Sequence, residues 1–152
     1  MPRSLVLLLA FSLGGCSIFG PEDPEPTLLL LETDQSSYSL AEHDEIRIVA
    51  TNRSESVLYF NTCMSARLDP LSGPGPSSIL LPTCLCLCVT ELRPGERWTY
   101  TISTQWFEAN ADTLQPGRRH TYRAQLAFYR DEALQHLLPD AELFTNRFDV
   151  TQ

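Results

Sequence analysis

The chain is 152 residues long and acidic, with a formal net charge of −8 at pH 7. All 11 of its basic residues are arginine. A chain this acidic lacks the basic face that nucleic acids and anionic lipid headgroups require, which argues against both as partners. The length fits a single domain.

The first 16 residues resemble the signal of bacterial lipoprotein precursors. Arg3 precedes an apolar stretch, Leu5 to Leu13, which is shorter than the ~20 residues that span a bilayer but suits the core of a signal peptide. "LGGC" (13–16) follows and resembles the bacterial lipobox. The resemblance implies that residues 1–15 are a signal peptide and that Cys16 is lipidated after cleavage. The alternative is an ordinary secretory signal with a coincidental cysteine.

Residues 16–26 are predicted to be the lipidated cysteine and a tether. "GPEDPEP" (20–26) is rich in proline and acidic residues, so it favours an extended chain that reaches roughly 20 Å. Ser17 after the cysteine, by the sorting rule of bacteria with two membranes, implies the outer membrane. The acidic run is compatible with display on the cell surface and with attachment at the periplasmic face of the outer membrane, and it favours neither location. Removal of residues 1–15, which carry one Arg and no acid, gives a mature charge of −9.

Residues 27–152 are predicted to form one all-β domain. Apolar or alternating runs between turn residues predict seven strands, at 27–33, 44–52, 57–63, 83–92, 97–103, 121–129 and 146–151. "NRSES" (52–56) predicts a hairpin turn, and residues 69–79 predict a loop. Tight turns are predicted at "RPGE" and "QPGR", where Gly95 and Gly117 supply the turn glycines.

One short helix is predicted before the last strand. Residues 130–140, "RDEALQHLLPD", begin with acidic residues and end at Pro139, with apolar residues at helical spacing between them.

This element pattern predicts a single antiparallel β-sandwich with immunoglobulin-like topology. Two residues favour that topology. Tyr122 stands just inside a strand after a turn, as in a tyrosine corner, and Trp98 lies on the inward face of residues 97–103.

Longer stretches resemble a class of bacterial immunoglobulin-like lipoprotein domains. They are "ETDQSSYSLAEHDEIRIVATNRSESVLYFNTC", "LRPGERWTY" and "LQPGRRHTYRAQLAFY". Their order of Tyr, turn, alternating strand, Asn-x-Ser, aromatic strand, Cys and Leu-x-Pro-Gly is similar to that class. The outline is also partly similar to the intracellular proteinase inhibitor domain, although no inhibitory loop maps onto this sequence residue by residue.

The four cysteines behind the anchor are Cys63, Cys84, Cys86 and Cys88, an even number that favours disulfides in an oxidising compartment. Residues i and i+2 of a regular strand lie about 6.6 Å apart, whereas the Cβ atoms of a disulfide lie about 3.8 Å apart. Without a bulge, neighbours in "CLCLC" therefore cannot pair. We expect one bridge from Cys63 to one of the other three cysteines, with Cys86 or Cys88 favoured. The two remaining cysteines would stay as thiols in the core, or pair with each other if a bulge allows.

Two other interpretations of the cysteines stay open. Reduced thiolates of all four could bind a soft metal, copper before zinc, or serve redox chemistry. The sequence lacks the paired Cys-x-x-Cys knuckles of zinc sites, so we expect no cofactor.

The function predicted from sequence is non-catalytic, since no hydrolase, metalloprotease or phosphate-binding motif is present. We expect a lipid-anchored domain that binds or supports another envelope or extracellular component through a protein partner. A metal-binding or redox lipoprotein and a proteinase-inhibitor-like module, for which loop 69–79 is the only candidate, are the alternatives.

Overall fold

The computed structural model describes residues 27–64, 66–71, 79–81, 86, 88–109 and 117–152. The predicted signal peptide, Cys16 and the tether therefore lie outside the described residues. Within the described residues the chain is all-β, as predicted. It forms the strands β1 (Leu29–Thr33), β2 (Ser37–Ser39), β3 (Glu45–Asn52), β4 (Leu58–Asn61), β5 (Arg67–Pro70), β6 (Ile79–Leu80), β7 (Val89–Leu92), β8 (Arg97–Ser103), β9 (Arg119–Gln125) and β10 (Phe148–Thr151).

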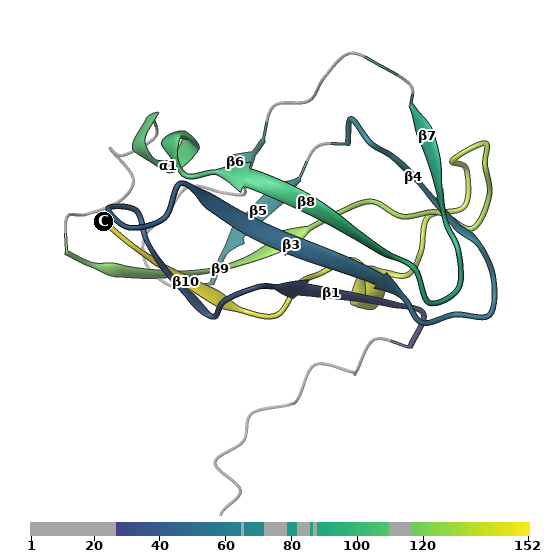
Figure 1. Ribbon diagram of the computed structural model, residues 1–152, viewed down its shortest axis with the longest axis horizontal. Coiled ribbons are helices and arrows are strands. Elements are labelled where there is room, and N and C mark those ends of the chain that lie inside the picture. Colours follow the sequence, from purple (N-terminus) through teal and green to yellow (C-terminus); the bar gives the residue numbers. More distant parts are fainter. Residues whose placement is uncertain (1–26, 65, 72–78, 82–85, 87, 110–116) are drawn as a thin grey trace, which may run out of the picture.

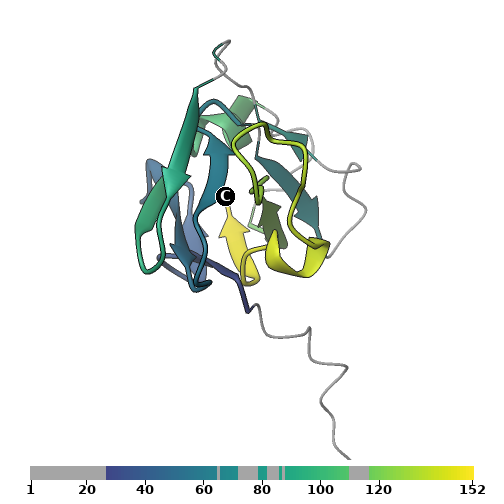
Figure 2. The same ribbon diagram turned by 90° about the vertical axis from the view of Figure 1, so that its right-hand side faces the viewer.

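These strands pair into three sheets, ordered β1-β3-β8, β2-β10-β9-β5-β6 and β4-β7. Figure 1 shows β8, β3 and β1 running side by side, with β9, β10 and β5 behind them, and Figure 2 shows the same arrangement turned by 90°. The expected purely antiparallel pairing is wrong at one place, because β10 pairs with β2 in parallel. The two strands come from opposite ends of the domain, so no hairpin dictates their direction.

The core is built by the alternate residues of facing strands. Ile46, Ile48 and Ala50 of β3 are fully buried, and so is Val150 of β10. They belong to one cluster with the buried residues of β9 and β5. Each large apolar side chain contributes about 1.5–3 kcal/mol through burial, so this cluster is the main source of stability.

The alternation predicted for residues 97–103 is confirmed in β8. Trp98 and Tyr100 are half-buried and Ile102 is buried, while the residues between them are exposed. The Trp98 ring packs on Phe60 with their centroids 4.4 Å apart. Tyr122 in β9 is also inward, with its ring edge-on to Phe107.

The predicted turn at 52–56 exists, but it is not a hairpin. β3 pairs with β1 and β8, whereas β4 pairs with β7, so this turn carries the chain from one sheet to another. Asn52 organises it: its side-chain amide donates to the backbone oxygens of Ser56 (2.8 Å) and Leu92 (2.7 Å). Its side-chain oxygen accepts from the backbone N–H and hydroxyl of Ser54.

The turn at 93–96 returns the chain from β7 to β8 beside the first turn. Gly95 has φ of 77° and Gly117 has φ of 72°, the left-handed region in which glycine is favoured. The Gly95 N–H donates to the Asn52 backbone oxygen at 2.8 Å. Asn52 thus links the turn at 52–56 to the turn at 93–96.

The helix predicted at 130–140 is wrong. The Asp131 carboxylate accepts the backbone N–H groups of Gln135 and His136, and Leu134 adopts φ of 55°. Tyr129 forms isolated β-bridges to Tyr59 and to Leu137, so the segment closes as a loop against β4. Aspartate competes for backbone donors in this way, which disfavours a helix.

The helical segments of the described residues lie elsewhere, at α1 (Gln105–Ala109) and at a 3-10 turn, η2 (Asp140–Glu142). The short strands β2, β5 and β6 were not predicted. β5 and β6 take both ends of the expected loop 69–79, and residues 72–78 lie outside the described residues. No helix among the described residues is long and apolar enough to cross a membrane.

The first residues of the domain are held by one carboxylate. Glu142 of η2 is 7% exposed. It accepts the backbone N–H groups of Thr27 (3.0 Å), Leu28 (2.9 Å) and Leu29 (3.1 Å), and the Thr27 hydroxyl (2.9 Å). Burial by itself raises the pKa of Glu142, but these donors outweigh burial and lower the pKa below its usual value. Strand β1 therefore begins on a buried, charged anchor.

Candidate functional site

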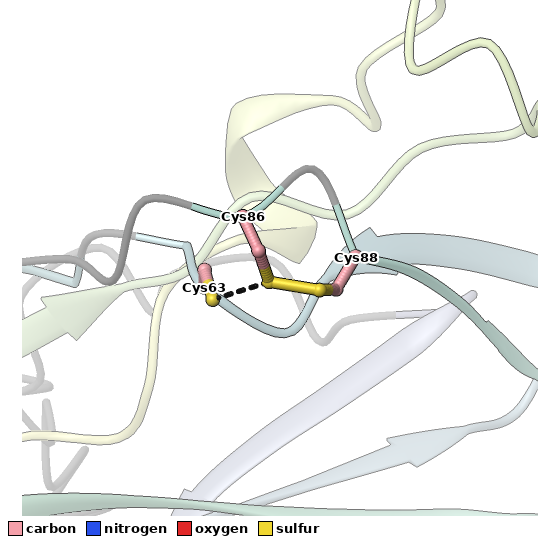
Figure 3. Close-up of side chains that lie close together, drawn as sticks. All are labelled: Cys63, Cys86 and Cys88. Atoms are coloured by element: carbon pink, nitrogen blue, oxygen red, sulfur yellow. Dashed lines mark hydrogen bonds between the residues drawn. A yellow bond between two sulfur atoms is a disulfide. The ribbon is translucent and has the colours of Figure 1, made fainter.

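The described cysteines gather where β4 ends and β7 begins. Cys63 lies in the turn after β4, and Cys86 and Cys88 lie directly before β7. Antiparallel pairing of the two strands, which ends with Asn61 opposite Val89, brings these segments together. Figure 3 shows the three side chains converging from the two segments.

The three sulfur atoms lie in a row with Cys86 in the middle (Figure 3). Cys86 and Cys88 form a disulfide, and their Cα atoms are 5.3 Å apart. The Sγ atom of Cys63 lies 2.9 Å from the Sγ atom of Cys86. Cys63 is itself disulfide-bonded, so neither sulfur carries a proton, and we interpret this approach as a sulfur–sulfur contact.

Cys63 is disulfide-bonded, as expected, but the favoured partners, Cys86 and Cys88, are wrong, since these two cysteines pair with each other. The expectation assumed a regular strand over residues 83–92, whereas β7 spans only Val89–Leu92. A Cα separation of 5.3 Å is shorter than the roughly 6.6 Å of an extended i, i+2 pair, and this shortening permits the bond. Cys84 lies outside the described residues.

Asn61 positions both segments and is not among the site residues predicted from sequence. Its side-chain oxygen accepts the Cys63 N–H at 2.9 Å, and its amide donates to the Cys86 backbone oxygen at 3.2 Å. The next residue, Thr62, donates its N–H to the Cys88 backbone oxygen at 3.0 Å. "FNTC" contains the available signal, because an asparagine side chain often accepts the N–H two residues later.

The cysteines at the two ends of this row of sulfur atoms differ in their exposure to solvent. Cys63 is 9% exposed and sits beside buried Met64, whereas Cys88 and Val89 are exposed. One end of the row therefore faces the core and the other faces solvent.

A metal could use these sulfurs only after reduction. The ligand atoms of Cys63, Cys86 and Cys88 lie within 4.8 Å of one another, and three convergent thiolates suit a soft ion such as Cu(I). Metal binding requires deprotonated thiols, and a disulfide supplies none. In the disulfide-bonded form these three cysteines offer no thiolate to a metal, and their chemistry is that of the disulfide bond.

The other predicted residues belong to the scaffold. Gly95 and Gly117 occupy turns, and burial raises the pKa of the Tyr122 hydroxyl. Trp98 is linked to strand β4 through its ring contact with Phe60. The tyrosine corner expected at Tyr122 stays a prediction.

Comparison with known proteins finds no matching family model and no matching curated protein. Among solved structures, a β-glucosidase from Listeria innocua in complex with isofagomine is 16% identical with a TM-score of 0.41; the match covers 81% of this chain and 16% of that chain. A β-glucosidase from Erythrobacter marinus is 12% identical with a TM-score of 0.40, covering 80% of this chain and 15% of that chain. The chain thus spans about a sixth of the length of these enzymes.

Proposed function

We propose that this chain is an outer-membrane lipoprotein, anchored through Cys16, whose immunoglobulin-like β-sandwich binds or supports another envelope or extracellular component without catalysis. The observation that carries the proposal is "LGGC" directly behind the apolar stretch of residues 5–13. Lipid chains contribute about 0.8 kcal/mol per buried methylene, and two or more hold a protein on a membrane durably.

The attachment of β1 supports this role. Glu142 accepts the N–H groups of Thr27, Leu28 and Leu29, so the first described residues, which follow the expected tether, are fixed to a segment more than 110 residues away in sequence.

The edge of the large sheet supports a binding role. β6 is the last strand in the order β2-β10-β9-β5-β6, and its Leu80 is 66% exposed. An end strand with an exposed apolar side chain offers backbone groups and contact area to another chain.

The anchor is tested by expressing the full chain in a bacterium with two membranes that is fed a radiolabelled fatty acid. We expect label on the wild-type chain and none on Cys16→Ser, with Ser12→Ala in the apolar stretch as a labelled control. Fractionation should place the wild-type chain in the outer membrane. Label that persists in Cys16→Ser, or an unlabelled wild-type chain, would refute the anchor.

A second candidate function is thiol chemistry at the cysteine row, favoured by the 2.9 Å contact between the sulfurs of Cys63 and Cys86. It is compatible with the first, because it uses other residues.

A further inference from the structure

The outward face of the large sheet gathers arginine side chains. Strands β5, β9 and β10 lie side by side in this sheet (Figure 1). Arg119 and Arg123 alternate with buried residues along β9, so they stand on the side of the sheet that faces away from the core. Arg67 stands on the same side, beside buried Leu68 of β5. We call Arg67, Arg119 and Arg123 the arginine face.

The acidic net charge predicts no basic face, yet the fold builds a small one. Among the described residues of β5, β9 and β10, the acids are Asp69 and Asp149, and both are half-buried. The exposed acids of the described chain lie on other segments. Arg118 directly precedes β9 and Arg147 directly precedes β10. The arginine face is therefore a local positive region on an acidic domain.

Arg123 is held in position while its hydrogen-bond donors remain unused. Its guanidinium carbon lies 3.8 Å from the centroid of the Phe144 ring. Its Nε atom is buried and has no hydrogen-bond partner among the described residues. The Oδ2 atom of Asp69 is 4.0 Å away, beyond hydrogen-bond distance. Buried donors without a partner are rare in folded proteins and call for an explanation such as a bound ion.

Asp69 is shared by two arginines, so it does not neutralise the face. Its carboxylate accepts hydrogen bonds from Nε and Nη2 of Arg67, each at 2.9 Å, and Arg123 lies on its other side. One negative charge between two guanidinium groups leaves a net positive charge. The side chains of Arg67 and Arg123 are 42% and 33% exposed, so an anion from solvent can reach both.

Arg119 supplies a second point of contact farther along β9. Its side chain is 70% exposed, and Asp149 lies 3.5 Å from its Nη1 atom. A surface ion pair of this kind contributes little, so a partner can replace it. Arg119 and Arg123 are four positions apart in one strand, which corresponds to about 13 Å. Side chains four positions apart in an extended peptide have the same separation.

We propose that the arginine face binds an extended acidic segment of a protein partner, with one carboxylate on Arg123 and a second carboxylate, four residues away, on Arg119. Arg67 adds positive charge beside the first. Arginine suits carboxylates because its planar group of donors meets both oxygens at once. The inference rests on the binding role proposed above, and it names the surface and the chemistry of the partner.

The spacing of the arginines favours a peptide over a continuous polyanion. A nucleic acid carries a phosphate at every nucleotide, and this charge would also lie over the acidic surface around the arginine face. A peptide with acids at every fourth position places its charge only where the arginines stand. Between them it meets Thr121, an uncharged residue of the same strand.

The test is a titration of a labelled peptide with the full chain in non-ionic detergent, followed by fluorescence anisotropy. The probe carries aspartate at every fourth position, with serine, threonine and glycine between. The control peptide has the same residues with its aspartates in one block. We expect saturable binding of the probe at low salt and binding of the control that is weaker by about threefold or more. Binding should vanish in about 1 M salt, where charges are screened beyond about 3 Å.

The acidity of the chain makes this titration informative. Because the net charge is −8, the domain as a whole repels an acidic peptide, and attraction must come from a local surface. Equal affinity for the two peptides, or no saturable binding up to about 1 mM protein, would overturn the proposal.

Three variants locate the binding surface. Arg123→Gln should weaken binding of the probe about tenfold, since a hydrogen bond to a charged group is lost. Arg119→Gln, at an exposed position, should weaken it about threefold. Arg97→Gln removes the same charge from an exposed position of β8 in another sheet and should leave the affinity unchanged. If Arg123→Gln misfolds, Arg119→Gln decides the matter. Wild-type affinity in Arg119→Gln, or an equal loss in Arg97→Gln, would refute the assignment.

Two further outcomes separate this inference from its neighbours. Polygalacturonate is an acidic polysaccharide without a peptide backbone, and tighter binding of it than of the probe would overturn the peptide in favour of a polysaccharide. A chain that carries fatty-acid label on Cys16 but does not bind the probe would sink this inference and leave the proposed anchor in place. A chain that binds the probe without label would do the reverse.

Discussion

The carboxylate of Glu142 accepts a hydrogen bond from the backbone N–H of Leu29, 113 residues earlier in the chain, at 3.1 Å. The same carboxylate takes the N–H groups of Leu28 and Thr27. It closes the domain by joining its first strand to the 3-10 turn that precedes its last strand.

Replacement Glu142→Gln should destabilise the domain by about 2–4 kcal/mol, because hydrogen bonds to a charged group contribute about 1.5–3 kcal/mol each and the amide places an N–H donor against N–H donors. Denaturant unfolding measures the loss. Glu132→Gln, at an exposed position, is the matched control and should stay within about 0.5 kcal/mol. Equal stability of the two variants would show that the Glu142 carboxylate is not an anchor.

The stabilising effect of Glu142 should depend on pH. Its pKa is lowered in the folded state, so the unfolded state binds its proton at higher pH than the folded state does. The contribution is therefore fully present above the ordinary glutamate pKa of about 4.3, and it is lost as the pH falls through the lower folded value. The difference in unfolding free energy between wild type and Glu142→Gln should shrink on acidification below that pKa. A difference that grows in acid would contradict the assignment.

Tyr38 should make the domain sensitive to alkali. Burial first, and then donation of its hydroxyl to Asp34 at 2.6 Å, raise the pKa of Tyr38 to about 12. The phenol of Tyr38 ionises at lower pH in the unfolded chain than in the folded domain. The contribution of its hydroxyl to the free energy of unfolding is therefore complete below a pH of about 10 and is lost as the pH rises toward the folded pKa. Tyr38→Phe should cost about 1.5–3 kcal/mol at neutral pH and remove that alkaline loss. Urea unfolding at neutral and alkaline pH measures both effects. Identical alkaline slopes in the two proteins would contradict this prediction.

Asn52 should be intolerant even of a change that preserves its shape. Its amide donates to the backbone oxygens of Ser56 and Leu92, and it is 1% exposed. Asn52→Asp places a carboxylate against those two oxygens, so we expect a loss of about 3 kcal/mol or more. Asn146→Asp, at an exposed position whose amide donates to the Thr33 hydroxyl, is the control and should cost clearly less. Thermal unfolding of the two variants measures the losses. Similar losses would mean that Asn52 does not link the turns at 52–56 and 93–96.

The long strands followed from local pattern. Residues 97–103 alternate between large apolar and polar side chains, and β8 spans the same residues. β3 and β1 likewise lie within their predicted ranges. A period of two places every second side chain on one face whatever the rest of the chain does, so such strands are readable from sequence.

Segments whose structure depends on a distant or side-chain partner were missed or predicted wrongly. The three residues of β2 form a strand because β10 lies beside them. Residues 130–140 have helical spacing, yet the Asp131 carboxylate and the bridges of Tyr129 hold a loop. In both cases a distant or side-chain partner supplied hydrogen bonds that local propensity does not encode.

By itself the sequence determined the all-β class, the central strands, the turn glycines and the acidic surface, since each depends on local spacing or composition. Only the tertiary structure decided which strands pair, that Glu142 holds β1, and that Cys86 bonds Cys88 with Cys63 alongside. The physical reason is that sulfur–sulfur bonding depends on distances of a few ångströms. Those distances were set by the register of β4 on β7 and by one asparagine side chain, Asn61.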